Sequence, residues 1–505
     1  MRKMKENACN NENQKKNPGF LLSAVSSNSG KTAAACGLMS AFKQEGKRVC
    51  ACKCGPDYID PMFHREVLDV DSKNLDLFFS EEEVLKEGYL RHTKDADITI
   101  TEGVMGFYDG MSLDSVKGSS YDVAQTLGLP VILVINARGA AMTLAAVVKG
   151  IAEFRPDSNI RGILLNRVSV MLYPRLKAML ETELVQIGHD EIKIVGYMPE
   201  NEVFHLESRH LGLVTPQEME NLQEKVRQAG EILAKTVDLE LLEKIAGEAA
   251  VWKTEVIEES EKVGNLKSKN DPVRIAVARD EAFCFYYKDN LELLESLGCE
   301  LIEFSPLHDK KLPENVKGIL LGGGYPELYG KELAENQSML ESIRRALDDK
   351  IPCLAECGGF MYLHEEMEDT AGNVWKLVGR IKGRTFPTGK LVRFGYVNLQ
   401  RSPDENPISE FKEQMSLANS WILPGENIRA HEFHYWDSTD SGSDCLAVKP
   451  DGKRRWKCIH MEENLVAGYP HVYYPSCKEF AERFVEKCRS GYKEYNKEKQ
   501  QQMSL

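Results

Sequence analysis

Short apolar runs alternate with longer stretches of helical periodicity along most of the chain. In the first half, apolar runs of strand length predict β-strands at residues 19–25, 48–53, 98–101, 129–136 and 160–166. Helices are predicted between or after these strands, at residues 33–44, 140–154 and 216–246. Strands separated by helices are typical of a parallel, doubly wound sheet, so we expect an α/β domain here.

The second half shows the same alternation in a different arrangement. Strands are predicted at residues 274–278, 301–304, 318–321 and 352–356. Helices are predicted to run up to Leu297, to start over Phe360–His364, and to cover residues 478–487, with a strand- and loop-rich stretch before the last of these. We detect no internal repeat, so the fold class is α/β with two different doubly wound domains.

The same patterns predict the domain boundaries. We expect a disordered arm at residues 1–18, a first domain at 19–250, a second domain at 273–490 and a disordered tail at 491–505. Residues 251–272 are charged and aperiodic, which favours a linker; a solvated helix face is the alternative.

Composition limits the class of protein. The 505-residue chain has a formal net charge of −14, which argues against a nucleic-acid groove as its main purpose. No apolar run is long enough to span a bilayer, and residues 1–17 lack the apolar core of a signal peptide. Thirteen cysteines, scattered without a disulfide-scaffold spacing, fit a reducing compartment. We therefore expect a cytoplasmic protein with no membrane and no nucleic-acid partner.

A phosphate-binding loop is predicted after the first strand. Ser26-Ser-Asn-Ser-Gly-Lys-Thr32 joins that strand to an alanine-rich helix. In such a loop the backbone amides around Ser29 and Gly30 cradle phosphate oxygens, Lys31 adds a positive charge, and Thr32 can ligate Mg²⁺. The alternative is a plain turn at the start of a helix, because Gly-Lys-Thr alone also occurs by chance.

Four acidic residues recur just past predicted strand ends. Asp57 and Asp60 follow the second strand in a predicted turn, and Glu102 and Asp109 follow the third. The carboxyl ends of parallel strands form the ligand-binding edge of an open sheet. Carboxylate oxygens near a phosphate loop favour Mg²⁺, although each acid taken singly could be a turn former or a helix cap.

Cys50, Cys52 and Cys54 alternate along the second strand. We expect them to be small core residues, because no matching pair of cysteines or histidines follows nearby to complete a metal site.

A candidate nucleophile lies in Leu354-Ala-Glu-Cys-Gly-Gly-Phe360. Cys357 is expected at a sharp strand-to-helix turn, where Gly358 and Gly359 allow close backbone packing. This is the nucleophile-elbow arrangement with sulfur as the nucleophile, and a helix N-terminus would favour the thiolate. A small buried cysteine before a helix is the alternative. Gly322-Gly-Gly-Tyr-Pro-Glu327 follows another strand, and its amides could bind an oxyanion.

Five motifs together resemble those of one enzyme family: Gly-Pro-Asp-Tyr-Ile-Asp-Pro (55–61), Glu-Gly-Val-Met-Gly-Phe-Tyr-Asp-Gly (102–110), Ala-Arg-Asp-Glu-Ala-Phe-Cys-Phe-Tyr-Tyr (278–287), Gly-Gly-Gly-Tyr-Pro-Glu (322–327) and His-Glu-Phe-His-Tyr (431–435). The set is similar to that of cobyrinate a,c-diamide synthase, over nearly all of residues 19–488. The resemblance implies a P-loop-like, dethiobiotin-synthetase-like ATP domain followed by a class I glutamine amidotransferase-like domain. It also implies a carbon–nitrogen ligase of cobalamin biosynthesis that amidates the a and c carboxylates of cobyrinate, using ATP, Mg²⁺ and L-glutamine.

The resemblance also implies roles for residues. Ser29, Gly30, Lys31, Thr32 and Asp57 would bind ATP; Thr32, Asp60 and Glu102 would bind the metal; Asp109 would lie near the reacting carboxylate. Cys357 would attack glutamine with His471 as its base, and amides at Gly323, Gly324 and Gly358 would form the oxyanion hole. His431, Glu432 and His434 are expected to face the tetrapyrrole or an interface, a buried structural role being the alternative. The oligomeric state stays open, a homodimer being one candidate.

The sequence departs from the family pattern at two places. Ala24 and Asn28 replace phosphate-loop glycines, although Asn28 can adopt a left-handed conformation. Tyr473 stands two residues after His471, where many class I amidotransferases carry the glutamate that orients the histidine. The choice of His471 over His434 or His460 rests on the pattern Tyr-Pro-His-Val-Tyr.

Two other functions remain open from the sequence. One is the same reaction on a related tetrapyrrole, such as Ni-sirohydrochlorin or hydrogenobyrinate. The other, from a different class, is a nucleotide-dependent switch with an inactive amidotransferase-like domain. The altered phosphate loop is the reason that this alternative stays open.

Overall fold

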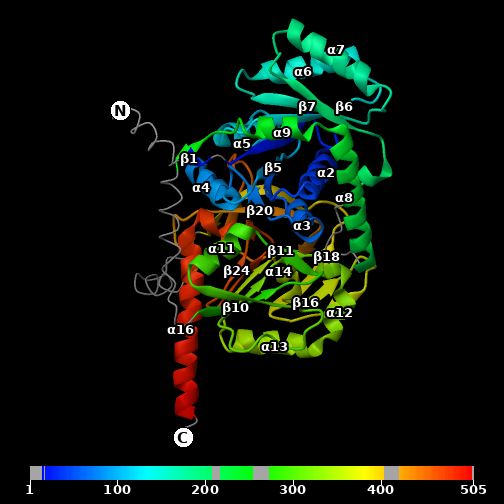
Figure 1. The fold of residues 1–505 in the computed structure, drawn as a ribbon. Coiled ribbons are helices and arrows are strands. Elements are labelled where there is room, and N and C mark those ends of the chain that lie inside the picture. The colour runs from blue at the N-terminus through cyan, green and yellow to red at the C-terminus, as the bar shows by residue number, and fades with distance from the viewer. Residues whose placement is uncertain (1–13, 16, 207–215, 254–271, 403–419, 503–505) are drawn as a thin grey trace. The chain divides into compact units, whose positions relative to one another are not determined.

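The computed structural model describes residues 14–15, 17–206, 216–253, 272–402 and 420–502 (Figure 1). The chain divides into two compact units, residues 1–261 and 262–505, so the division falls inside the segment predicted as a linker. Most of that segment, residues 254–271, lies outside the described residues, as does most of the predicted N-terminal arm. Among the described residues, no helix has the length and apolar character needed to cross a membrane.

The first unit is built on a seven-stranded parallel sheet. Its strand order is β4-β3-β5-β2-β6-β7-β8, with β2 near the centre. The strands are β2 (Gly19–Ala24), β3 (Val49–Cys54), β4 (Ser72–Leu75), β5 (Ile98–Glu102), β6 (Val131–Asn136), β7 (Ile160–Asn166) and β8 (Lys193–Met198). The predicted doubly wound α/β architecture is confirmed, and β4 and β8 are strands that the sequence patterns did not reveal.

Helices cover both faces of this sheet. One face packs against α4 (Glu82–Thr93), α5 (Ser120–Leu127), α6 (Met142–Phe154) and α7 (Tyr173–Gln186) through a continuous apolar core. On the other side, α2 (Lys31–Gln44), α8 (Pro216–Thr236) and α9 (Leu239–Ala246) contact the strands or one another. Cys50, Cys52 and Cys54 are buried in β3, which confirms their predicted core role.

The second unit has a six-stranded sheet in the order β12-β10-β13-β15-β25-β24. All neighbouring pairs are parallel except β24 with β25. The strands are β10 (Val273–Ala278), β12 (Cys299–Phe304), β13 (Gly318–Leu321), β15 (Cys353–Glu356), β24 (His460–Met461) and β25 (Leu465–Gly468). This confirms the second α/β domain, and the predicted strands at 318–321 and 352–356 match closely.

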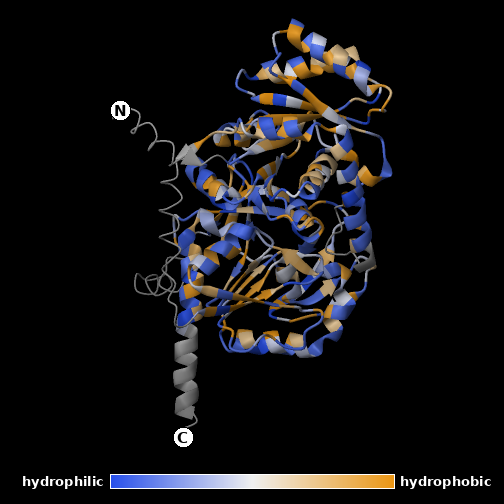
Figure 2. Cartoon of the chain, viewed as in Figure 1, coloured by the Kyte–Doolittle hydropathy of each residue, from blue (hydrophilic) through white to orange (hydrophobic). Residues whose placement is uncertain are grey.

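Two layers enclose this second sheet. One core lies under α12 (Gly330–Glu335), α13 (Gln337–Asp348) and α14 (Gly358–Tyr362). The other contains α11 (Lys288–Ser296), α16 (Lys478–Gln502) and an antiparallel sheet ordered β23-β22-β19-β20-β26. Its strands are β19 (Arg393–Arg401), β20 (Ile428–His434), β22 (Cys445–Val448), β23 (Arg455–Cys458) and β26 (His471–Val472). In Figure 2 the surface helix α13 carries both hydrophilic and hydrophobic colours, as its one-sided burial requires.

Three local predictions were wrong. The last helix extends to Gln502 instead of ending at Lys487, so it enters the segment predicted as a disordered tail. Lysine, glutamate and glutamine favour helix, and no proline interrupts the run. The helix after Cys357 ends at Tyr362, and His364 instead begins strand β16 (His364–Glu368). Asp60 lies in α3 (Ile59–Glu66) instead of in a turn.

Candidate active sites

The phosphate-loop residues form a tight turn at the carboxyl end of β2. Gly30 has φ +94° at the start of α2, and Asn28 adopts the left-handed conformation that the sequence allowed, with φ +61°. The Asn166 side chain, at the end of β7, donates a hydrogen bond of 2.8 Å to the Ser29 carbonyl. A Cβ at Gly30 would lie 2.3 Å from the Asn166 amide nitrogen, so this turn requires glycine.

Lys31 and Thr32 begin α2 and point their polar groups toward the end of β5. The Lys31 ammonium donates hydrogen bonds to the carbonyls of Ser26 and Met105. The Thr32 hydroxyl donates to Glu102 Oε1 over 2.6 Å. Burial, together with the nearby Lys53, lowers the pKa of Lys31 to about 8. The loop therefore holds a lysine whose charge would be stabilised by an incoming anion.

A buried lysine that the sequence reasoning did not single out joins two of the predicted metal ligands. Lys53, on β3, lies 2.6 Å from Asp60 Oδ2 and 2.9 Å from Glu102 Oε1. His64 Nε2 lies 3.5 Å from the other oxygen of Glu102, and all four side chains are buried. The available signal was a single lysine in the otherwise apolar strand Val49–Cys54.

The charges in this cluster depend on one another. Burial alone would lower the pKa of Lys53, but Asp60 and Glu102 outweigh it and raise that pKa. Burial and the neighbouring Glu102 raise the pKa of Asp60 to about 8. Glu102 is itself buried, yet Lys53 and His64 hold its pKa well below the usual range. Glu102 is therefore the carboxylate that stays ionised.

The other two acids are arranged differently. Asp57 Oδ1 accepts the backbone N–H of Ile59 over 2.8 Å, so Asp57 helps to begin α3. Asp109 is exposed, and its Oδ2 accepts the backbone N–H of Gly106 over 2.9 Å. Both lie in loops past strand ends, as predicted, since Asp57 follows β3 and Asp109 follows β5.

The oxygen donors here suit Mg²⁺ in kind. Glu102 Oε2 is a buried acceptor with no hydrogen-bond partner among the described residues, and the Thr32 hydroxyl lies next to the same carboxylate. Asp60 Oδ2 and the other oxygen of Glu102, Oε1, are both already paired with Lys53. Within the described residues, no group of three or more His, Cys, Asp or Glu side chains is preassembled around a metal position. Thr32 and Glu102 therefore fit a magnesium ion directly, and Asp60 only if it leaves Lys53.

In the second unit Cys357 occupies the predicted elbow. It has φ +48° and ψ −102° between β15 and α14, a conformation that costs about 1–3 kcal/mol for a non-glycine residue. Its backbone N–H donates to the Gly468 carbonyl over 2.8 Å. A Cβ at Gly359 would lie 2.1 Å from the Leu321 carbonyl oxygen, which explains the small residue after the elbow. The sharp strand-to-helix turn is thus observed.

The glycine motif and His471 converge beside this elbow. A Cβ at Gly323 would lie 2.3 Å from His471 Cε1, so the glycine is in contact with the imidazole. A Cβ at Gly358 would lie 3.0 Å from the Gly324 nitrogen, so the glycine motif lies next to the residue that follows Cys357. The N–H of Gly322 is used differently, since it donates to the Tyr286 hydroxyl over 2.8 Å.

The protonation states do not match the predicted thiolate. Cys357 is only 8% exposed. This burial, and to a lesser degree the nearby Glu327, raises the pKa of its thiol. The helix after it has just five residues, too few to offset that burial. Burial, with His431 and His434, lowers the pKa of His471 to about 3, so the imidazole is neutral at pH 7. A neutral imidazole can accept the proton that the thiol retains.

The three residues expected near the substrate are buried, and the side chains of Glu432 and His434 are hydrogen-bonded. Glu432 accepts from Trp456 Nε1 over 3.2 Å and lies 3.2 Å from His434 Nε2. The His434 ring stacks on Tyr469 at 3.9 Å, and His431 lies opposite His471 in the β20–β26 pair. This arrangement favours the structural alternative. Of the candidate histidines, His471 contacts the glycine motif, whereas His460 hydrogen-bonds the Asp440 carbonyl.

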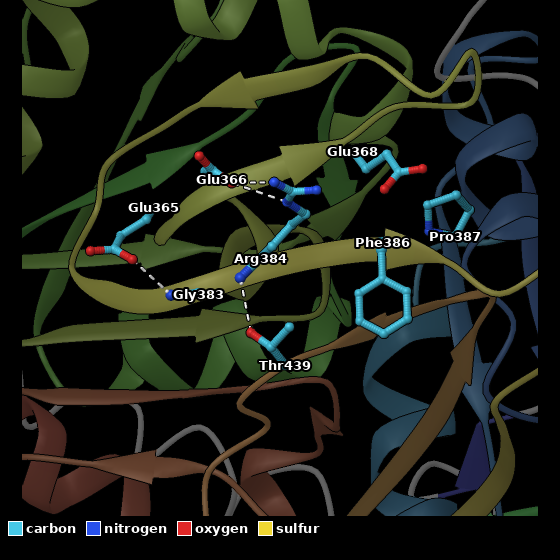
Figure 3. A pocket seen from close by; sticks show the side chains of 8 residues that line it. All are labelled: Glu365, Glu366, Glu368, Gly383, Arg384, Phe386, Pro387 and Thr439. Carbon is cyan, nitrogen blue, oxygen red and sulfur yellow. Dashed lines mark hydrogen bonds and ion pairs between the residues drawn. The ribbon is translucent and has the colours of Figure 1, made fainter.

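A separate pocket of about 650 Å³ opens between β16, β18 (Ile381–Pro387) and the segment near Thr439 (Figure 3). Its lining includes Glu365, Glu366 and Glu368. Arg384 in this pocket is already paired with Glu366 at 2.7 Å. The pocket contains none of the predicted site residues.

Two family models match the chain. Residues 21–214 match the CobQ/CobB/MinD/ParA nucleotide binding domain, and residues 274–477 match the CobB/CobQ-like glutamine amidotransferase domain. The first match contains the phosphate loop and the Lys53 cluster, and the second contains Cys357 and the glycine motif.

Curated relatives match over nearly the whole length. A protein from Caldanaerobacter subterraneus subsp. tengcongensis named cobyrinate a,c-diamide synthase is 37% identical over 474 residues, covering 93% of this chain and 98% of the relative. A protein of the same name from Clostridium tetani is 39% identical, covering 93% of this chain and 99% of the relative. Identity at this level over this length shows that the chain belongs to the cobyrinate a,c-diamide synthase family.

Proposed function

We propose that this protein amidates the a and c carboxylates of cobyrinate, taking nitrogen from glutamine and energy from ATP. The observation that carries the proposal is the strained Cys357 elbow, with His471 against its glycine motif, in a chain that also has a Gly-Lys-Thr loop beside the buried Glu102. A thiol site for releasing ammonia and a phosphate site for activating an acid are the two parts that such a ligase needs.

The first unit would activate the substrate. A carboxylate is a poor electrophile, because an oxide would have to leave. Its oxygen would attack the γ-phosphorus of ATP, ADP would leave, and an acyl phosphate would form. Ammonia would then attack the carbonyl carbon and displace phosphate, leaving the amide. Lys31 and the loop amides would bind the phosphates, and Asp109, exposed in its loop, would face the substrate carboxylate.

A magnesium ion held by Thr32 and Glu102 would offset the negative charge of the phosphates. Lys53 contributes to the same site by keeping Glu102 ionised and oriented. Asp57 would position the loop next to the nucleotide from the start of α3.

The second unit would release ammonia. His471 would take the thiol proton of Cys357 while sulfur attacks the glutamine amide carbon. The oxyanion formed would be bound by amides at Gly323, Gly324 and Gly358. The C–N bond would break as His471 returns the proton to the leaving nitrogen. Water would then hydrolyse the thioester, so that glutamate leaves and the thiol is restored.

The test is incubation of the full chain with cobyrinate, ATP, Mg²⁺ and glutamine, followed by mass spectrometry of the product. We expect two amide groups, formed with ADP, phosphate and glutamate. Cys357→Ser should abolish glutamine use and leave amidation by added ammonia intact, since only the thiol step is removed.

Three outcomes would contradict the proposal. Glutamine use by Cys357→Ser would reject the nucleophile. Amides on Ni-sirohydrochlorin or hydrogenobyrinate, with none on cobyrinate, would reject the substrate. ATP binding without any amide or glutamate formed would favour the nucleotide-dependent switch.

A further inference from the structure

Glu356 immediately precedes Cys357 in the chain. It is the last residue of β15 and lies opposite Gly468, the last residue of β25. The chain leaving β25 reaches His471, the first residue of β26, three residues later, so Glu356 lies beside the strand that leads to the imidazole. Only 14% of the Glu356 side chain is exposed.

The segment 471–474 surrounds this carboxyl group. Glu356 Oε2 lies 3.9 Å from His471 Nδ1, and Oε1 accepts a hydrogen bond of 3.2 Å from the Tyr474 hydroxyl. The backbone N–H of Val472 also stabilises its charged form. A carboxyl group placed against the ring of a catalytic histidine is the arrangement that selects a tautomer.

The segment is itself held in place by α11. Asn290 donates its amide N–H to the Val472 carbonyl over 2.7 Å and accepts the Tyr474 backbone N–H over 2.8 Å. The Tyr473 hydroxyl donates to Asp289 over 3.0 Å. Tyr473, which stands where many class I enzymes carry the orienting acid, is therefore directed toward α11.

We propose that Glu356 is the positioning residue for His471: its carboxylate accepts the Nδ1–H of the imidazole, so that Nε2 is the nitrogen left to take the thiol proton. The proposal rests on the glutaminase function inferred above. The same carboxylate would stabilise the imidazolium that forms when the thiol proton has moved. The gap of 3.9 Å must close by about 1 Å to become a hydrogen bond, and such catalytic contacts often shorten when substrate binds.

The role requires an ionised Glu356, and its surroundings set when that occurs. The titratable groups that face it are His471, Tyr474, Tyr286 and Cys357. Burial raises the pKa of Glu356 to about 8, opposed in part by the Tyr474 hydrogen bond. The glutaminase rate should therefore rise with pH as Glu356 loses its proton, and the imidazolium formed during turnover would promote that loss.

The test compares glutaminase activity of the full-length wild type, Glu356→Gln, His471→Ala and the double variant. We expect Glu356→Gln to lower kcat about 10²-fold with little change in KM, because the amide keeps the shape and removes the charge. Glu356→Asp should recover part of the loss. In the His471→Ala background, Glu356→Gln should have no further effect, since it acts only through the imidazole.

Glu426→Gln is the matched control. Glu426 is also a half-buried glutamate of the second unit, paired with Arg483, and it has no place in the thiol site. It should lower the unfolding temperature at least as much as Glu356→Gln and leave glutaminase kcat unchanged. A shared loss of kcat in both variants would mean general damage to the fold, and would overturn the proposal.

Other outcomes separate this proposal from the function on which it rests. A wild type without glutaminase activity rejects the proposed function itself. An active wild type with Glu356→Gln within twofold of it rejects only the positioning role. Multiplicative losses in the double variant, or a pH profile that Glu356→Gln leaves unaltered, also reject that role.

Discussion

At Gly323 there is no room for a side chain, because a Cβ would lie 2.3 Å from the ring of His471. We expect Gly323→Ala to displace the imidazole and to lower glutaminase kcat by about 10²-fold, since small misplacements of catalytic groups have effects of this size. Steady-state kinetics on the full chain would measure it.

Gly150→Ala provides the control for this substitution. A Cβ at that position has no neighbour within 4 Å, and the residue is inside helix α6, where alanine is favoured over glycine. It should leave glutaminase unchanged. Full activity in Gly323→Ala would show that the contact with His471 does not matter.

Lys53 is the second residue whose replacement has a clear expected outcome. Lys53→Met would leave Asp60 and Glu102 buried without their cation, which costs about 3–5 kcal/mol in comparable buried pairs. Urea unfolding would measure the loss. Lys47→Met removes only a half-exposed pair with Glu243 and should cost less than about 1 kcal/mol. Equal costs for both would contradict the buried cluster described here.

The turns that were predicted correctly are those that a few neighbouring residues define. They are the strand-to-helix turn at Cys357, with its glycines, and the turn at Gly30 before Lys31. Lys53 and Glu356 were missed because their partners are brought together by parallel strand pairing, over 49 residues in the case of Lys53 and Glu102. The expected Cys357 thiolate is not supported, because burial raises the pKa of that thiol. This burial results from packing of the whole domain, which no local sequence pattern reveals.

Among the elements, α11 has the most direct effect on the thiol site, through Asn290 at its first turn. Asn290→Ala would leave the Val472 carbonyl and the Tyr474 N–H without this partner. We expect a loss of about 1–3 kcal/mol in stability and a lower glutaminase rate, because the segment carrying His471 loosens.

Thermal unfolding and glutaminase assays together would check this. Ser296→Ala removes an exposed hydroxyl near the other end of α11, which donates a hydrogen bond of 2.7 Å to the Leu293 carbonyl. It should alter neither quantity noticeably. A fully active Asn290→Ala would show that the helix does not control the segment.

Elements with a single buried face or a continuous apolar run were predictable. Strand β7 was predicted within its observed bounds, and β2 within one residue. The antiparallel strands β19 and β20 were not resolved in advance, because their pairing joins Arg393–Leu399 to Ile428–His434 across a long intervening stretch. No local pattern indicates such a pairing.

For the whole molecule, buried titratable groups predict how stability depends on pH. Burial raises the pKa values of four acids: to about 8 for Asp60 and Glu356, to about 7 for Glu327, and above its usual value for Asp280. These groups keep a proton in the folded state that the unfolded chain has lost, so stability falls as pH rises from about 4.5 toward 8. Buried His364, His431 and His471 have lowered pKa values and act oppositely, but only below about pH 6.5.

Below pH 6.5 the effects of the buried acids and the buried histidines on stability nearly cancel. The net loss of stability should therefore be visible between pH 6.5 and 8. Each acid contributes at most about 1.4 kcal/mol per pH unit. Unfolding temperatures across this range would measure the trend, and Glu356→Gln should flatten it. Stability that increases toward pH 8 would contradict these protonation states.

The distribution of sulfur has a practical consequence. The described residues include twelve cysteine thiols, and all but Cys284 are buried. A reagent such as Ellman's would therefore count few groups in the native protein and many more in guanidinium. The absorbance change of this reagent would therefore report unfolding. An oxidant should modify far more thiols in the denatured protein than in the native one.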